Sequence, residues 1–177
     1  QESMDRAERF VAYCQKLDCP KIRTFTDCGP TGIGSDVATP EHWETAIGCL
    51  KTMTAFDRDV LFVVETHAKT LADTPESALR LLDEVGAPNL KLNFQFLGGD
   101  VVADYEKVKP HVCHAHLQGK GPDGEHGYVD EDTGTLALLL EHMKADGYDE
   151  SVSIEYCWKG ADWAHAESAC AFLKRHI

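Results

Sequence analysis

The sequence predicts an α/β fold in which parallel strands alternate with helices. Short apolar runs alternate with helical patterns along the whole chain, and no two neighbouring runs are joined by a hairpin turn signal. Alternation at this pitch implies parallel strands with right-handed crossovers. A closed (β/α)8 barrel takes about 250 residues, or ~31 per βα unit, so the 177 residues hold fewer than eight units. Two folds remain: an open α/β sheet, or the later part of a barrel without its first units.

Five segments carry the apolar spacing, the N-cap residues or the terminal glycine of a helix. Ser3 is a plausible N-cap of the first, Thr39-Pro40 begins the second, and Gly86 ends the third. The predicted helices are residues 3–17, 39–53, 73–86, 133–146 and 162–176, with at best a short helix over 104–108.

The predicted strands are short apolar runs bounded by glycine, proline or polar residues. The run at 60–65 is apolar at five successive positions without alternation, which indicates a strand buried on both faces. The predicted strands are residues 21–28, 60–65, 90–95, 111–117 and 151–156, and the glycine-bearing segment 119–130 is expected to be a loop.

Polar side chains end four successive strands: Glu65, Gln95, His116 and Glu155. A carboxylate at the end of a buried strand is costly unless it is paired, and strand carboxyl ends are where α/β proteins bind ligands. One such residue could simply pair with a neighbour, but four in succession indicate a shared site. Two carboxylates, an imidazole and an amide oxygen suit a hard or borderline divalent ion such as Mn²⁺, Mg²⁺ or Co²⁺.

Composition narrows the functional class. The formal net charge of −13 argues against a nucleic-acid-binding surface, and no run is long enough to span a membrane. There is no dinucleotide fingerprint and no P-loop. The seven cysteines include no CxxC pair and lie mostly in apolar context, which favours buried, reduced thiols in a cytoplasmic protein. Because the chain opens at Gln1 without Met, a fragment or a processed chain is expected.

Three strings resemble the xylose isomerase-like TIM barrels: Val-Val-Glu-Thr-His (63–67), His-Ala-His-Leu-Gln-Gly-Lys (114–120) and Gly-Tyr-Asp-Glu-Ser-Val-Ser-Ile-Glu-Tyr (147–156). The resemblance covers nearly the whole chain. It implies that residues 1–177 are a single domain, the part of a (β/α)8 barrel from about strand four to helix eight, without the first ~3 units. That superfamily includes sugar-phosphate isomerases, ketose 3-epimerases, inosose dehydratases, hydroxypyruvate isomerases and endonuclease IV.

The resemblance also implies a site. By position, the family's metal ligands become Glu65, Gln95, His116 and Glu155. The family usually has Asp where this chain has Gln95, so Asn93 on the same strand is a competing ligand, and His114 is expected to be a core or supporting residue. The extra ligands of the trinuclear endonuclease branch are missing, which disfavours DNA repair.

The expected activity is that of a sugar or sugar-phosphate isomerase or epimerase. A divalent ion polarises the substrate carbonyl and stabilises an enediolate, while Glu65 and Glu155 act as general base and acid. His67, Lys120 and Trp158 follow strand ends and could contact the carbohydrate; Lys120 is the strongest of these. Two alternatives stay open: a dehydratase of the inosose or dehydroshikimate type, and a non-catalytic sugar-binding barrel with a degenerate metal site. No nucleic acid or membrane partner is expected, and a homo-oligomer is compatible with the sequence.

Overall fold

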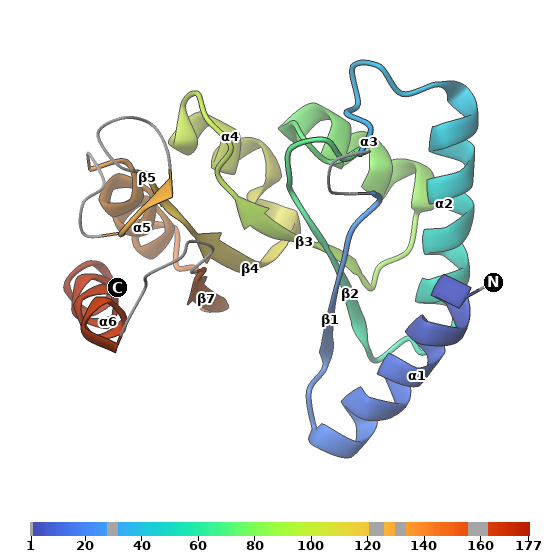
Figure 1. Ribbon diagram of the computed structural model, residues 1–177, viewed down its shortest axis with the longest axis horizontal. Helices are drawn as coiled ribbons and strands as arrows, with labels where there is room; N and C mark the ends of the chain where they lie inside the picture. The colour runs from blue at the N-terminus through green and yellow to red at the C-terminus, as the bar shows by residue number, and fades with distance from the viewer. Residues whose placement is uncertain (1, 28–31, 121–125, 130–133, 156–162) are drawn as a thin grey trace. The chain divides into compact units, whose positions relative to one another are not determined.

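The computed structural model describes residues 2–27, 32–120, 126–129, 134–155 and 163–177. Five parallel strands form one sheet in the order β1-β2-β3-β4-β7, alternating along the chain with helices (Figure 1). The strands are β1 (Lys21–Thr24), β2 (Leu61–Glu65), β3 (Leu90–Gln95), β4 (Val112–Leu117) and β7 (Ser151–Ile154). The helices are α1 (Glu2–Leu17), α2 (Pro40–Thr54), α3 (Pro75–Val85), α4 (Val101–Val108), α5 (Thr135–Ala145) and α6 (Trp163–His176), with a 3-10 turn at Lys109–His111. The predicted α/β class and its five parallel strands are confirmed.

The chain divides into two compact units. The first contains residues 1–93 and 107–113, and the second contains residues 94–106 and 114–177. The division falls within β3 and again within β4, so that each unit holds the polar ends of different strands.

In the first unit, β1 and β3 pair in parallel with either side of β2, and α1, α2 and α3 lie on one side of these strands (Figure 1). Thr39 and Thr74 cap α2 and α3, each accepting a hydrogen bond from the backbone three residues on, as the sequence predicts. Gly86 ends α3 with φ of 66°, a left-handed conformation that glycine adopts without strain.

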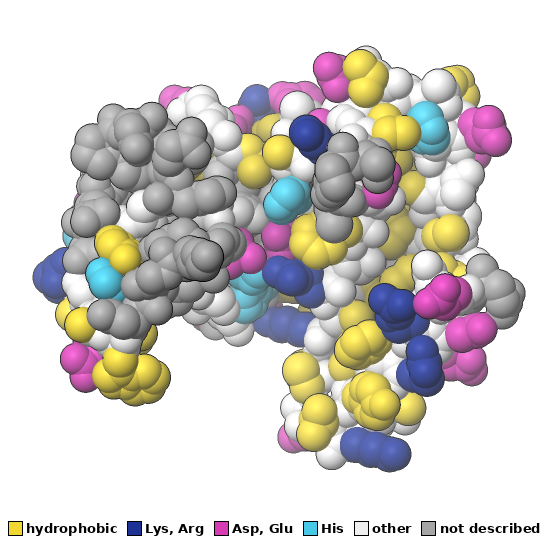
Figure 2. Space-filling view, in the orientation of Figure 1, with side chains coloured by type: hydrophobic (Ala, Val, Ile, Leu, Met, Phe, Trp, Pro, Cys, Tyr) yellow, Lys and Arg dark blue, Asp and Glu magenta, His cyan; other side chains and the backbone are white. Residues whose placement is uncertain are grey.

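Helix α1 buries only part of its apolar surface. Ala7, Val11 and Cys14 are buried, whereas Phe10 is 48% exposed and Leu17 is 75% exposed. The helical spacing of these five residues predicts one apolar face, whereas the structure buries three of them and exposes two. Figure 2 shows apolar and basic side chains together on the visible surface of this region.

In the second unit, β4 and β7 pair in parallel, with His116 opposite Ser153. The inner face of α5 is apolar and buried through Leu136, Leu139, Leu140 and Met143. The predicted loop at 119–130 contains two short antiparallel strands, β5 (Gly119–Lys120) and β6 (His126–Gly127). The prediction of a loop is therefore wrong for these four residues, because strands of two residues leave no alternating pattern in a sequence.

Helix α4 begins three residues before the predicted start at Asp104. The Asp100 carboxylate accepts hydrogen bonds from the backbone N–H groups of Val102 and Ala103, at 3.1 and 3.0 Å, and so caps the helix. His111, predicted in the strand that follows, belongs to the 3-10 turn instead.

Among the described cysteines, Cys14 and Cys113 are buried, and Cys19, Cys49 and Cys170 are exposed. None of these five forms a disulfide. The apolar sequence context of Cys49 and Cys170 predicts burial, and for these two the prediction is wrong. Among the residues that the structure describes, no helix has the length and apolarity needed to cross a membrane.

Candidate functional site

Glu65 ends β2 as a buried carboxylate with two strong hydrogen-bond donors. Its side chain is 1% exposed. Arg23 Nη1 of β1 donates to Glu65 Oε2 at 3.0 Å, and Asn93 Nδ2 of β3 donates to the same oxygen at 2.8 Å. The parallel register explains the second contact, because Glu65 lies directly opposite Asn93. The two donors stabilise the buried carboxylate and fix its orientation.

Asn93 has an unused polar atom beside this carboxylate. The residue is 1% exposed, and its Oδ1 accepts no hydrogen bond from any residue that the structure describes. A buried amide oxygen without a donor is unfavourable unless another group, such as a cation, interacts with it. Together with Glu65, Asn93 therefore supplies oxygen donors for a cation in the first unit.

The second unit brings together three of the four predicted ligands. Gln95 Nε2 lies 3.5 Å from Glu155 Oε2, and His116 Nδ1 lies 3.8 Å from the same oxygen. Gln118, just past β4, accepts a hydrogen bond from Gln95 Nε2 at 3.2 Å. Glu155 continues the β4–β7 ladder, since its backbone N–H donates to Leu117 O at 2.9 Å. Two strand-end residues, Gln95 and His116, therefore approach one carboxylate oxygen of the third, Glu155.

His114, which the resemblance implies is a core or supporting residue, contacts the neighbouring strand and His116. Its Nε2 lies 2.9 Å from Ser153 Oγ on the neighbouring strand. Its ring meets that of His116 edge to face, with centroids 5.2 Å apart. These contacts hold His114 in place and restrict the orientation of His116.

The predicted substrate-contacting residues are only partly described. His67 follows β2, where its ring meets that of Phe25 at a centroid distance of 5.6 Å and its Nδ1 lies 2.8 Å from Ala68 O. Lys120 lies in β5, with its backbone opposite His126. Trp158 lies outside the described residues. Substrate contacts by these three remain predictions.

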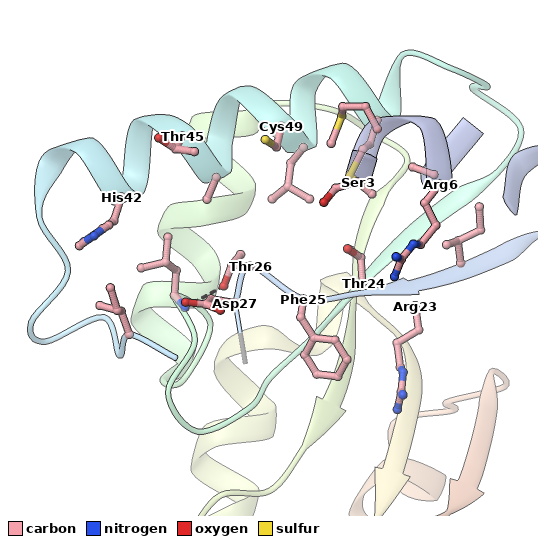
Figure 3. Close-up of a pocket in the computed structure, with 18 of the residues that line it drawn as sticks. Ser3, Arg6, Arg23, Thr24, Phe25, Thr26, Asp27, His42, Thr45 and Cys49 are labelled. Carbon is pink, nitrogen blue, oxygen red and sulfur yellow. Dashed lines mark hydrogen bonds between the residues drawn. The ribbon is translucent and has the colours of Figure 1, made fainter. Parts of the chain in front are cut away.

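A cavity of about 640 Å³ lies in the first unit beside β1, between α1 and α2 (Figure 3). It is lined by Arg6, Arg23, Thr26, His42 and Cys49 among others, and does not include Glu65. Since β1 is the last strand on that side of the sheet, the cavity follows a strand edge that has no partner among the described strands. The cavity is thus a feature of the sheet edge, and Arg23 is the residue that connects it to Glu65.

The sequence pattern missed two participants, Arg23 and Gln118. The alternation of Lys21 and Arg23 along β1 is the available signal for Arg23, because alternate residues of a strand share a face. Lys21 also uses that face, donating from Nζ to Cys113 O at 2.8 Å. Gln118 follows the predicted ligand by two residues and lies within the string at 114–120, but that string did not indicate a contact with Gln95.

The donor atoms fit a divalent cation. Carboxylate and amide oxygens with one imidazole suit ions such as Mn²⁺ and Mg²⁺. The orphaned Asn93 Oδ1 is the observation in this structure that favours a cation over a closed network of hydrogen bonds. In that case Gln95 and Asn93 both remain candidates for the ligand from β3.

Parallel βα units with polar strand ends define a class of barrel-type α/β proteins. Within that class, the model of the family described as "Xylose isomerase-like TIM barrel" matches residues 1–176. The chain belongs to the xylose isomerase-like TIM barrel family. The resemblance found in the sequence is confirmed.

Curated relatives include both a lyase and isomerases. A 3-dehydroshikimate dehydratase of Bacillus anthracis is 32% identical over 124 residues, covering 67% of this chain and 43% of the relative. A mouse protein named putative hydroxypyruvate isomerase is 25% identical over 169 residues, covering 86% of this chain and 59% of the relative. The chain thus spans about half the length of the curated relatives it matches.

Solved structures share the fold. A probable 3-DHS dehydratase of Bacillus anthracis superposes with a TM-score of 0.80 at 22% identity, covering 98% of this chain and 69% of that one. A xylose isomerase-like protein of Mycobacterium smegmatis, solved in complex with magnesium, gives 0.77 at 14% identity, with coverage of 98% and 66%. D-psicose 3-epimerase of Clostridium cellulolyticum, solved with D-tagatose, gives 0.77 at 15% identity, with coverage of 99% and 70%.

Proposed function

We propose that this chain carries the metal-binding half of an enzyme that isomerises or epimerises a sugar or sugar phosphate by moving a proton next to a carbonyl. The observation that carries the proposal is Glu65, a buried carboxylate fixed by two donors at the end of β2, where the family builds its site. The cluster of Gln95, His116 and Glu155 in the second unit supports the same assignment.

The two glutamates have different surroundings, which favour different roles. Glu65 is 1% exposed and already receives hydrogen bonds from Arg23 and Asn93, so it suits a fixed, ligating carboxylate. The Glu155 side chain is 26% exposed and can reach a substrate. Glu155 is therefore the general base that removes the proton beside the carbonyl, and it returns the proton as the acid.

Glu65, His116 and Glu155 would hold a divalent cation, with Gln95 or Asn93 as the fourth ligand. When bound, such an ion polarises the carbonyl and stabilises negative charge on the substrate oxygens. The magnesium complex of the Mycobacterium smegmatis relative supports this class of ion. An amide in the family's aspartate position lowers the negative charge of the site, so weaker ion binding is expected than with aspartate.

A dehydratase is the second candidate, and a specific observation favours it. Among the relatives described above, the dehydratase has the highest identity, at 32%. A dehydratase of this type begins with the same proton removal, and the carbanionic intermediate then loses a neighbouring hydroxyl as water. The same residues would serve both reactions, so the fate of the intermediate decides between them.

Solvent exchange tests the proposal. The full-length natural protein, loaded with Mn²⁺ in D₂O, is incubated with ketoses, hydroxypyruvate and 3-dehydroshikimate in turn, and deuterium uptake is measured by mass spectrometry. We expect exchange into one substrate class, with a loss of 18 mass units only for a dehydratase. Glu155→Gln should lower the exchange rate by about 10²–10⁴-fold.

A control variant, Glu141→Gln, removes an exposed carboxylate on α5 and should exchange at the wild-type rate. Wild-type exchange in Glu155→Gln would remove that residue from the mechanism. Absence of exchange in the metal-loaded wild-type protein with every substrate would favour the non-catalytic barrel.

A further inference from the structure

A second group of metal-ligating side chains lies in the second unit, on helices that carry none of the strand-end residues. Glu106 comes from the last turn of α4, while His142 and Asp146 come from the end of α5. One ligand atom from each of these residues lies within 4.8 Å of the other two. We propose that this group, here called the helix-end cluster, binds a divalent transition-metal ion of the Zn²⁺ type.

The chemistry of the group is mixed, with one imidazole nitrogen and two carboxylate oxygens. Zn²⁺ takes such donors at about 2.0–2.2 Å, and three protein ligands with water in the fourth position make a tetrahedral site. Tetrahedral geometry at those bond lengths sets neighbouring donors about 3.3 Å apart. His142 Nε2 lies 3.8 Å from Asp146 Oδ2, so a small rotation of either side chain suffices.

The positions of the two α5 residues make this spacing natural. His142 and Asp146 are four residues apart, and so they lie on the same face of the helix one turn from each other. Asp146 is the C-cap of α5, and its backbone N–H donates to His142 O at 3.0 Å. The backbone therefore fixes two of the three ligands relative to each other.

Both carboxylates of the helix-end cluster approach the same nitrogen of His142. Glu106 Oε1 forms a hydrogen bond with His142 Nε2, and Asp146 Oδ2 approaches the same nitrogen. An imidazole nitrogen carries at most one proton. A metal ion between the three side chains, in contrast, would be bound by one donor atom from each of them. This convergence on one nitrogen is what distinguishes the group from an ordinary surface ion pair.

The surroundings favour a cation in two further ways. Glu106 and His142 lie in the last turns of their helices, where the macrodipole is negative. The His142 ring meets the buried Tyr105 ring edge to face, with centroids 6.2 Å apart, which restricts its orientation. The three side chains are 29–39% exposed, so an ion can reach them from solvent.

The test is a titration of the full-length natural protein with Zn²⁺, followed by calorimetry, and with Co²⁺, followed by visible absorption. His142→Ala should weaken ion binding at this position by at least about tenfold. The titration should then show one binding event fewer over the concentration range in which the wild-type site fills. Asp146→Asn, which keeps the helix end and the His142–Glu106 pair, should weaken it as well. Because neither residue belongs to the proposed active site, substrate exchange should persist in both variants.

The matched control is His176→Ala. His176 Nδ1 lies 3.2 Å from Glu141 Oε1, and no second carboxylate among the residues that the structure describes completes the cluster geometry with this pair. Its Zn²⁺ stoichiometry and affinity should equal those of the wild-type protein. NMR of the folded wild-type protein provides a measurement without mutation, since Zn²⁺ should shift the His142 ring nitrogens and leave those of His176 unchanged.

Equal stoichiometry and affinity in the wild-type protein and His142→Ala would overturn the proposal. So would His142 ring signals that respond to pH but not to Zn²⁺, since they would identify an imidazolium held between two carboxylates without an ion. Loss of the strand-end activity leaves this result unaffected, because the two sites share no residue.

Discussion

Replacing Arg23 with Met should show how strongly the stability of the first unit depends on the positive charge beside Glu65. Met keeps the length and apolar volume of the arginine stem but removes its charge. Glu65, with a side chain 1% exposed, would then retain Asn93 as its described hydrogen-bond donor. A buried carboxylate that loses a charged partner is destabilised, because its desolvation is no longer compensated.

The size of the effect follows from the exposure of the pair. A hydrogen bond to a charged group contributes about 1.5–3 kcal/mol, and burial of an uncompensated charge adds to the loss. The Arg23 side chain is 49% exposed, so water screens part of the interaction. We therefore expect Arg23→Met to lower the free energy of unfolding by about 1.5–2 kcal/mol.

Urea unfolding of the full-length natural protein, in a chelating buffer without divalent ions, measures this loss. Arg6→Met is the control, because Arg6 and Glu2 form an exposed i,i+4 pair with side chains 61% and 87% exposed. Such a pair contributes about 0.3–0.5 kcal/mol. A double-mutant cycle with Glu65→Gln should give a coupling energy of about 1 kcal/mol or more. A cost no larger than that of Arg6→Met, or a coupling near zero, would refute this reasoning.

The remaining predictions concern the strand ends, the β5–β6 pairing and the sheet edges. Gln95→Asp should destabilise the metal-free protein, because Gln95 Nε2 lies 3.5 Å from Glu155 Oε2 and two carboxylates there would repel; the same variant should bind Mn²⁺ more tightly in calorimetry. Unchanged affinity, with weaker binding in Asn93→Ala, would identify Asn93 as the ligand. Gly119→Ala should disrupt the β5–β6 pairing, because an added Cβ would lie 2.4 Å from the Tyr128 backbone. Amide hydrogen exchange measures this loss. Gly48→Ala is the control, because nothing lies within 4 Å of a Cβ added there. Residues 1–177 produced alone should associate at micromolar concentration, since β1 and β7 are the outermost of the described strands of the sheet. A monomer in light scattering would contradict this.

The elements that the sequence predicted best are those with local signals. Thr39 and Thr74 mark the starts of α2 and α3, because an N-cap depends on residues three apart in the chain. Gly86 marks the end of α3, because the left-handed backbone conformation there favours glycine. The strand-end residue Glu65 was identifiable because the apolar run before it ends abruptly. The cap at Asp100 was equally local, but the preceding Gly98-Gly99 obscured it.

What the sequence could not reveal depends on contacts between distant segments. Arg23 pairs with Glu65 across 42 residues of chain, and only the register of β1 against β2 brings them together. The exposure of Phe10 and Leu17 was also unpredictable, because the apolar spacing of α1 does not show which part of that face finds a partner. The helix-end cluster likewise joins two helices that no motif connects.

The central claim is that Glu65, His116 and Glu155 hold one divalent ion in the full-length protein. Crystals of that protein soaked in Mn²⁺, with anomalous diffraction collected at the manganese edge, test this most directly. The account predicts an anomalous peak within about 2.0–2.6 Å of a carboxylate oxygen of each glutamate and of one His116 ring nitrogen, and its loss in Glu155→Gln. A peak that omits Glu65 or Glu155, or no peak at the strand ends at saturating Mn²⁺, would contradict the claim.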